Sequence, residues 1–253
     1  MKRYAILIAL ALAAASAPGV AAQAPGADEI LSRLDANASF RTIRYTARME
    51  ITIGGETRVK TMTAAAEGSA KAFIEFTNPE DRGTRYLKLD KSLWMWFPRE
   101  RDTVKISGHL LKEGMMGSDL SYEDALESSD YKARYAASLK GEEPVGDRPC
   151  RVVELVAKAP APGAAAAPYD RRVMWIDAER YVSLREEMYA KSGRLLKTSR
   201  CLDLRKIGSR WYPTRVELES KLRADTRTVF TLDKVELDVA LDPRQFTMGA
   251  LTK

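Results

Sequence analysis

Residues 44–66 read RYTARMEITIGGETRVKTMTAAA, and this stretch decides the fold class of the chain. Polar and apolar side chains alternate along residues 44–53, which is the spacing that puts every second residue of a β-strand on one face. The apolar face holds Tyr45, Ala47, Met49, Ile51 and Ile53. Gly54 and Gly55 then supply the two positive-φ positions of a tight hairpin turn. The stretch therefore predicts two paired strands, 44–53 and 56–66, with one buried face.

Strand-like segments recur along the rest of the chain, separated by turn-forming pairs such as Asn78-Pro79 and Asp90-Lys91. They cover residues 71–77, 85–90, 93–97, 103–107, 131–139, 151–156, 172–177, 181–189, 195–205, 211–220 and 226–241. Roughly a dozen strands joined mostly by short turns predict a mainly β protein with one large antiparallel sheet curled on itself. Several segments exceed the strand length of an immunoglobulin-type sandwich. The concave face of such a sheet must be filled by helices, by a ligand or by both.

Two short helices are expected beside the strands. Asp28 is the expected N-cap of the first, which ends by Phe40. The apolar face of this helix holds Ile30, Leu31, Leu34 and Ala38. Ser121 and Asp124 form a capping-box pattern that opens the second helix, through Leu126. A glycine-rich, partly apolar loop precedes the second helix at residues 108–119, and an Ala/Pro tract at residues 157–168 forms another loop.

The first 22 residues predict export. Lys2 and Arg3 precede an apolar run over residues 4–15, and Val20-Ala21-Ala22 is a small-residue cleavage site before Gln23. The run is shorter than the roughly 20 residues of a membrane span, so a cleaved signal peptide is favoured over an anchor. No cysteine lies near the cleavage site, so we do not expect an acylated N-terminus. The mature chain, residues 23–253, is expected to be a soluble, periplasmic single domain.

The amino-acid composition excludes some classes of protein function. The chain has 253 residues, of which 45% are hydrophobic and 30% are charged, and this excludes a mainly disordered protein. The formal charge of +6 falls to +4 when Lys2 and Arg3 are removed, and it is spread along the chain without a basic block. The sequence therefore indicates no nucleic-acid partner.

Few residues of the chain form a pattern that could support catalysis. His109 is the single histidine, so any Ser/His or Cys/His site must use it, and the chain has no Gly-x-Ser-x-Gly motif. Glu186 and Glu187 are neighbours on one expected strand, so they face opposite sides and cannot act on one substrate. Glu123 and Asp124 suit the first turn of a helix. We therefore expect no enzyme, metal or cofactor.

Cys150 and Cys201 have two open interpretations. In an oxidising compartment they can form a disulfide that closes a loop of about 50 residues, which would stabilise the fold by roughly 3 to 4 kcal/mol. The alternative is a pair of unpaired thiols, and the sequence leaves both open.

Large apolar side chains indicate a function more strongly than the candidate catalytic residues do. Trp94, Trp96 and Phe97 belong to one strand with bulky residues on both faces, so either both faces are covered or one binds a ligand. Met115 and Met116 lie between Gly114 and Gly117, and methionine adapts to irregular partners. These methionines suit either a mobile lid over an acyl ligand or a simple plug of the core.

Three motifs carry a resemblance to a known family. They are Trp94-Met95-Trp96-Phe97-Pro98, the stretch MGSDLSYED at residues 116–124, and Leu241-Asp242-Pro243-Arg244-Gln245-Phe246. With the N-terminal helix and the long strand that follows it, they resemble the outer-membrane lipoprotein-sorting proteins of the LolA-like superfamily, in a subgroup whose members mostly lack a defined role. The resemblance spans residues 23–253, and the central stretch is its most specific part.

The resemblance implies an unclosed antiparallel half-barrel with short helices as a lid over an apolar cavity. It implies a periplasmic carrier, expected as a monomer, that moves the acyl chains of lipoproteins or lipids from an inner-membrane transporter toward an outer-membrane acceptor. The alternative is an envelope sensor or accessory subunit that binds a membrane partner, such as an anti-sigma factor or transporter, without onward transfer. The acyl-binding residues expected are Tyr45, Met49, Ile51, Trp94, Trp96, Phe97, Met115 and Met116. No one arginine of this chain matches the strand arginine that latches the lid in the family's carriers.

Overall fold

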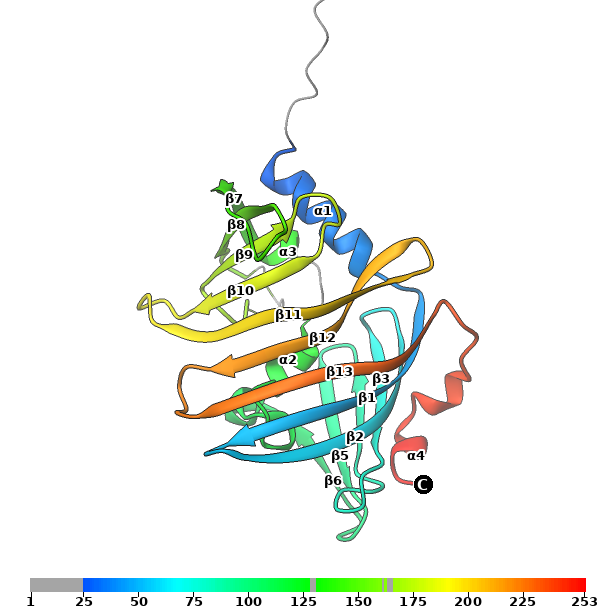
Figure 1. Cartoon of the computed structure of the whole chain (residues 1–253). Coiled ribbons are helices and arrows are strands. Elements are labelled where there is room, and N and C mark those ends of the chain that lie inside the picture. Colours follow the sequence, from blue (N-terminus) through cyan, green and yellow to red (C-terminus); the bar gives the residue numbers. More distant parts are fainter. Residues whose placement is uncertain (1–24, 128–130, 161, 163–165) are drawn as a thin grey trace, which may run out of the picture.

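The computed structural model describes residues 25–127, 131–160, 162 and 166–253. Within them, one antiparallel sheet of 13 strands makes up most of the molecule (Figure 1). The first half of the chain forms β1 (Thr42–Ile53), β2 (Glu56–Glu67), β3 (Lys71–Phe76), β4 (Arg85–Leu89), β5 (Ser92–Phe97) and β6 (Asp102–Ile106). The second half forms β7 (Tyr135–Glu142), β8 (Cys150–Ala157), β9 (Arg171–Asp177), β10 (Ser183–Tyr189), β11 (Leu195–Ile207), β12 (Arg210–Ser220) and β13 (Thr226–Leu237). The predicted signal peptide, residues 1–22, lies outside the described residues.

The strand order shows two meanders that meet in the middle of the sheet. From edge to edge it runs β6-β5-β4-β3-β2-β1-β13-β12-β11-β10-β9-β8-β7. Strands that are consecutive in each half are neighbours, and the pairing of β1 with β13 joins the halves. The edge strands β6 and β7 do not pair with each other in the described part of the chain. These findings confirm the mainly β, unclosed antiparallel sheet.

The hairpin predicted from residues 44–66 is confirmed. Ile53 pairs with Glu56 across the turn, and Gly54 and Gly55 have φ angles of 57° and 86°. The middle of the alternating series is buried, with Met49 exposing 1% of its surface. Ile53 differs, with 46% exposed, because it ends the strand at the tip of the hairpin.

The connection from β6 to β7 must pass from one edge of the sheet to the other. Its described part, residues 107–127, is called the crossover segment below. It contains the 3-10 turns η1 (Gly108–Lys112) and η2 (Met115–Gly117) and the helix α2 (Tyr122–Leu126). Figure 1 shows the sheet curving around α2. The crossover segment therefore lies on the inner face of the open sheet.

Two further helices cover the second half of the sheet. α1 (Ala27–Ala38) packs Ile30, Leu31 and Leu34 against β7, β8 and β9, but its N-cap is Gly26 and Asp28 lies in its first turn. α3 (Tyr131–Arg134) replaces the predicted start of a strand, which begins only at residue 135. The strand prediction was wrong there because α3 packs against α1, a tertiary contact that local propensity does not encode.

The C-terminal residues pack on the opposite face of the sheet. η3 (Pro243–Gln245) and α4 (Met248–Leu251) place Phe246 and Leu251 against Leu87 of β4. β13 ends at Leu237, earlier than predicted, because Asp238 takes a positive φ of 57° and turns the chain. No helix in the described residues is both long and apolar enough to cross a bilayer.

Candidate functional site

Apolar contacts hold the crossover segment against the first half of the sheet. Met115 and Tyr122 are buried in one cluster with Met49 and Tyr86. The hydroxyl of Tyr86 lies 3.2 Å from the hydroxyl of Tyr122 and donates to the sulfur of Met116 at 3.2 Å. Because neighbouring residues of a strand face opposite sides, Tyr86 faces the crossover segment while Leu87 faces α4. Two unrelated segments thus cover the two faces of β4.

Six of the eight predicted acyl-binding residues come together in this cluster. They are Tyr45, Met49, Ile51, Phe97, Met115 and Met116. Met49, Ile51 and Met115 expose 1 to 3% of their surface, because the crossover segment already packs on this part of the sheet. None of the eight lines the four cavities described below. In this conformation the cluster is a closed core, and the open space lies beside it.

The other two predicted residues lie on the opposite face. Trp94 and Trp96 belong to the cluster of Phe246 and Leu251, with Lys105 over the Trp94 ring at 5.5 Å. Side chains alternate between the two faces along β5, so Trp94 and Trp96 point away from the face of Phe97, which contacts the crossover segment. Both faces of β5 are therefore covered by the chain itself, and the two tryptophans are not on the wall that Phe97 helps to form.

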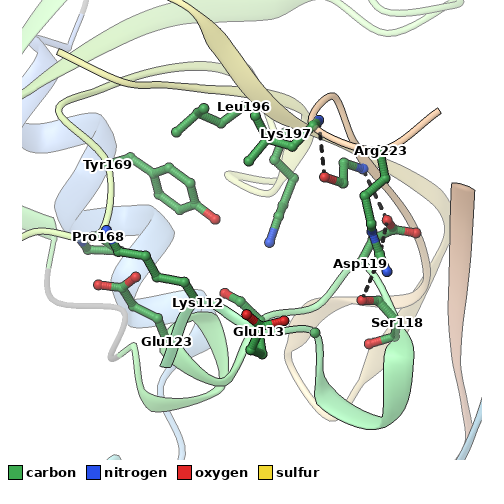
Figure 2. Close-up of a pocket in the computed structure, with 14 residues that line it drawn as sticks. Lys112, Glu113, Ser118, Asp119, Glu123, Pro168, Tyr169, Leu196, Lys197 and Arg223 are labelled. Carbon is green, nitrogen blue, oxygen red and sulfur yellow. Dashed lines mark hydrogen bonds and ion pairs between the residues drawn. The ribbon is translucent and has the colours of Figure 1, made fainter. Parts of the chain in front are cut away.

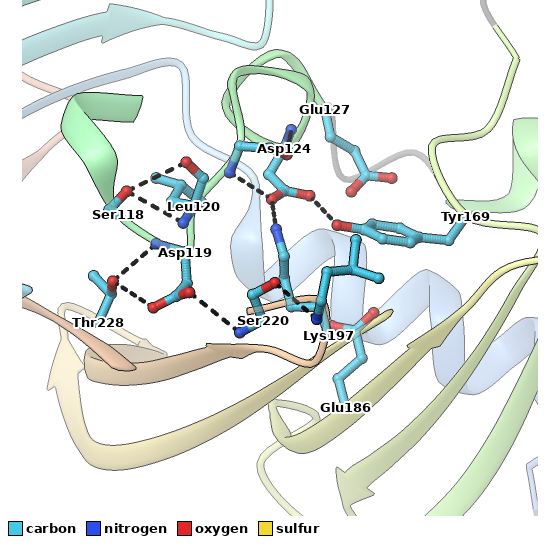
Figure 3. A network of polar contacts seen from close by, with 12 residues as sticks. Ser118, Asp119, Leu120, Asp124, Glu127, Tyr169, Glu186, Lys197, Ser220 and Thr228 are labelled. Carbon is cyan, nitrogen blue, oxygen red and sulfur yellow. Dashed lines mark hydrogen bonds and ion pairs between the residues drawn. The ribbon is translucent and has the colours of Figure 1, made fainter. Parts of the chain in front are cut away.

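Asp119 fixes the crossover segment to β12 and β13. Its side chain is fully buried and accepts hydrogen bonds from the hydroxyls of Thr226 and Thr228 at 2.8 and 2.9 Å (Figure 3). The guanidinium of Arg223 donates to the same carboxylate at 3.0 Å, and the amide of Ser220 donates at 3.3 Å. A buried carboxylate with this many donors is compensated for its desolvation.

Asp124 makes the second polar anchor, to β11. The predicted capping box is confirmed, since Ser121 and Asp124 each accept from the backbone of the other. The same carboxylate also pairs with Lys197 and accepts from the hydroxyl of Tyr169 at 2.7 Å (Figure 3). Burial alone would raise the pKa of Asp124, but Lys197 and the hydrogen bonds outweigh burial and hold this pKa below its usual value. Asp124 is therefore both a helix cap and an ion-pair partner.

Glu127 makes the third anchor, to β9. It pairs with Arg172, which also pairs with Glu186 at 2.7 Å and donates to the hydroxyl of Tyr135 at 3.1 Å. The Arg172 side chain is only 3% exposed. Burial raises the pKa of Glu127, and Arg172 and Arg134 oppose that rise. Three acidic residues of the crossover segment thus bind to the second half of the sheet.

A cleft of about 370 Å³ opens between the crossover segment and the ends of β11 and β12. Figure 2 shows Tyr169 and Lys197 on one side of it and Asp119 with Arg223 on the other. Two of its basic side chains have acidic partners, since Arg223 pairs with Asp119 and Lys197 pairs with Asp124. Both of these cations are therefore already neutralised by carboxylates of the crossover segment.

Three further cavities adjoin one another along the inner side of the sheet. The outer cavity, of about 460 Å³, has Leu111, Leu126 and Ala133 in its wall. The central cavity, of about 520 Å³, shares Ser69, Lys88 and Glu127 with it and is lined by Ala66, Ala72, Ala125 and Tyr212. The helix cavity, of about 140 Å³, shares Ala38 and Tyr212 with the central cavity and reaches Met174 and Trp211. Together they form a mostly apolar track beneath α1 and the crossover segment.

Small side chains create the space in the middle of this track. Ala66 of β2, Ala72 of β3 and Lys88 of β4 are consecutive partners across three strands, so they share the inner face. Alanine at two of these three positions leaves a gap that the crossover segment does not fill. The run Ala64-Ala65-Ala66 is the signal in the sequence that indicates this gap.

The geometry of Gly114 shows a steric requirement. A Cβ atom at this position would lie 2.0 Å from the carbonyl oxygen of Ser118, so the turn admits no side chain there. Met116 and Gly117 both have positive φ angles, 54° and 81°. The role of Gly114 and Gly117 as hinges of a moving lid stays a prediction.

The residues considered for catalysis do not form one site. His109 is exposed on η1. Glu186 pairs with Arg172, whereas Glu187 pairs with Arg185 at 2.5 Å on the other side of β10, as the strand period predicted. Within the described residues, no group of three or more His, Cys, Asp and Glu side chains is placed to hold a metal ion.

The disulfide interpretation is wrong for this structure, because both cysteines are free. Cys150 lies on β8 and Cys201 on β11, with β9 and β10 between them. Three strand spacings are about 14 Å, and a disulfide needs Cα atoms within about 7 Å. Burial raises the pKa of the Cys201 thiol to about 11, which keeps this thiol protonated and unreactive.

Comparison with known proteins places the chain in a family. A family model described as "Uncharacterized protein" matches residues 68–253, which is most of the chain. The fold is shared with two solved structures of low identity. A putative outer membrane lipoprotein-sorting protein domain from Vibrio parahaemolyticus is 18% identical with a TM-score of 0.77, covering 90% of this chain and 98% of that one. A LolA superfamily protein from Nitrosomonas europaea is 21% identical with a TM-score of 0.72, covering 90% of this chain and all of that one.

The chain belongs to the family that this model describes, and it shares its fold with a LolA superfamily protein. It is also similar to a DUF1329 family protein from Desulfovibrio piger, with 27% identity, a TM-score of 0.78, and coverage of 88% of this chain and 96% of that one. A search of the curated proteins gave no match. The fold that the resemblance implied is therefore confirmed.

Proposed function

We propose that this LolA-like protein is a periplasmic carrier that binds acyl chains of lipoproteins or lipids for transfer toward the outer membrane. The observation that supports the proposal is the apolar track formed by the outer, central and helix cavities. The central and outer cavities lie within the range of about 300 to 1,000 Å³ that small ligands occupy in proteins. Each methylene removed from water contributes about 0.8 kcal/mol, so a track of this kind can retain a hydrocarbon chain during aqueous transit.

Release of the chain is the harder step, and the crossover segment offers a means for it. The three polar anchors at Asp119, Asp124 and Glu127 hold the crossover segment over the inner face when the track is empty. A closed empty state competes with the ligand and lowers the apparent affinity. In this proposal an inner-membrane transporter loads the protein, and an outer-membrane acceptor with a better pocket unloads it.

A transfer assay with a cavity-filling variant tests the proposal. We expect the purified protein to move a dipalmitoylated lipopeptide from donor to acceptor vesicles. Ala72→Leu fills the central cavity and should reduce this transfer at least about tenfold, because the added atoms occupy the space of the chain. Ala136→Leu makes the same change at an exposed position of β7 and should transfer like the wild type.

Two results would contradict the carrier proposal. One is the absence of lipopeptide binding by the wild-type protein. The other is equal transfer by the Ala72→Leu and wild-type proteins, with the variant shown to be folded. Tight retention of the lipopeptide without passage to acceptor vesicles would point instead to a sensor or accessory subunit.

A further inference from the structure

Lys88 differs from the other buried cations of the inner face. Lys60 pairs with Asp81 at 2.6 Å, Lys197 pairs with Asp124, and Arg172 pairs with Glu127 and Glu186. Lys88 is 8% exposed, and its Nζ donates to the backbone carbonyl of Leu126 at 3.0 Å. Among the described residues, no carboxylate oxygen lies within the 4.0 Å of an ion pair from this Nζ.

The surroundings of Lys88 increase the cost of its charge. Burial lowers the pKa of the Lys88 ammonium, and the nearby guanidinium of Arg134 lowers it further. Glu127 lines the same cavities, but its carboxylate is engaged by Arg172 and Arg134. A buried ammonium without an anionic partner destabilises the protein that carries it, unless a ligand supplies the anion.

Lys88 lies at a point of the track where it could contact a charged group of a bound ligand. It lines both the central and the outer cavity, at the boundary that they share. Ala66 and Ala72 line the central cavity on one side of it, and Leu111 and Leu126 line the outer cavity on the other side. The outer cavity also carries Asp90, Lys91, Glu123 and Arg134. Other charged residues also line these cavities, but Lys88 is the buried cation at their shared boundary, and such a position suits the anionic group of a molecule with one hydrocarbon chain.

We propose that the track binds an anionic amphiphile, with Lys88 binding its carboxylate or phosphate while the hydrocarbon chain lies along the apolar walls. This inference rests on the proposed function, because it assigns the chemistry of the cargo at the same site. The contact of Lys88 with Leu126, the last residue of α2, also couples the site to the crossover segment. An anion that draws Lys88 away from this carbonyl would remove one of the contacts that hold the segment in place.

Binding of three ligands that share one chain length tests the inference. Dodecanoate, dodecyl phosphate and dodecanol are titrated calorimetrically into the full mature chain, below their aggregation concentrations. We expect at least one of the two anions to bind about tenfold or more tightly than dodecanol, as a charge-assisted hydrogen bond predicts. The affinities for dodecanoate and dodecyl phosphate show whether the site prefers a carboxylate or a phosphate. Lys88→Met should remove the preference and keep the binding of dodecanol.

Two controls separate recognition from a structural role. Lys234→Met makes the same change at an exposed lysine, whose side chain is 71% exposed, and should keep the preference. Urea unfolding checks that Lys88→Met is folded, because this variant removes both a buried charge and the hydrogen bond to Leu126. If this variant does not fold, Lys88→Gln serves as the neutral variant, and Lys88→Arg should keep the preference.

The outcomes distinguish this inference from the proposed function. Equal affinities for both anions and dodecanol would overturn the inference and leave acyl binding intact. A preference for the anion that survives in a folded Lys88→Met or Lys88→Gln variant would also overturn it. The absence of binding by all three ligands would contradict the proposed function itself.

Discussion

Asp119 shows how a single carboxylate can position a long connection. Its oxygens accept from Thr226, Thr228, Ser220 and Arg223, which all lie at the end of the β12–β13 hairpin. The backbone amide of Asp119 also donates to the hydroxyl of Thr228 at 2.9 Å. A threonine hydroxyl in a strand gains no partner from the sheet ladder, so this contact satisfies both groups. One residue thus fixes where the crossover segment meets the centre of the sheet.

We expect Asp119→Asn to destabilise the fold by about 3 kcal/mol, because it leaves Arg223 and two hydroxyls facing a neutral amide. Urea unfolding at neutral pH measures this change in free energy. Asp225→Asn is the matched control, since Asp225 is an exposed residue of the same hairpin with a positive φ of 53° that asparagine tolerates. Equal unfolding free energies for the two variants would contradict the role assigned to Asp119.

α2 is an element of one turn whose stability depends on its ends. The capping box of Ser121 and Asp124 satisfies its first amides, and Lys88 donates to the carbonyl of Leu126 at its last residue. Short helices are marginal in isolation, so caps and tertiary contacts decide whether they form. The conformation of the crossover segment is therefore sensitive to single polar groups.

We expect Ser121→Ala to reduce stability by about 1 kcal/mol through the loss of the N-cap. Hydrogen–deuterium exchange should rise in residues 113–127 and stay unchanged in the central strands. Thr247→Ala removes the corresponding cap of α4, where the Thr247 hydroxyl accepts from Ala250 at 3.2 Å, and should raise exchange only near the C-terminus. Faster exchange throughout the sheet in Ser121→Ala would show that α2 is no separate unit.

At the scale of the whole molecule, the two halves of the sheet hold the crossover segment by different forces. The first half packs on it through apolar side chains such as Met49 and Tyr86. The second half binds it through ion pairs, with Lys197 and Arg172 as partners of Asp124 and Glu127. Acid weakens ion pairs to carboxylates and leaves apolar packing intact. Acid should therefore loosen the segment on one side first.

The lowered pKa of Asp124 determines whether stability rises or falls with pH. A carboxyl whose pKa is lower in the folded state stabilises the fold above its unfolded pKa, and this contribution is lost as the pH falls through the folded pKa. We expect the free energy of unfolding to fall more steeply below about pH 4 in the wild type than in Asp124→Asn. Chemical denaturation at several values between pH 5 and pH 3 measures the two slopes. Parallel slopes would contradict the ion pair with Lys197.

Much of the fold could be predicted from the sequence because strand period and turn residues act locally. The alternation around Met49, the turn at Gly54 and the capping box at Ser121 each depend on neighbours in the chain, and the structure confirms all three. The same local reasoning failed at residues 131–134, where packing against α1 makes a helix. The family could be recognised because its motifs are themselves contiguous.

The sequence by itself determined an open antiparallel sheet, its inner apolar series and the helix at residue 122. Only the tertiary structure decided which acyl-binding candidates face the inner side, since Trp94 and Trp96 lie with α4 instead. It also decided the positions of the cavities and left Lys88 with no anionic partner among the described residues. The physical reason is that cavities and ion pairs form between residues far apart in the chain, whereas periodicity records only which face a residue shares with its near neighbours.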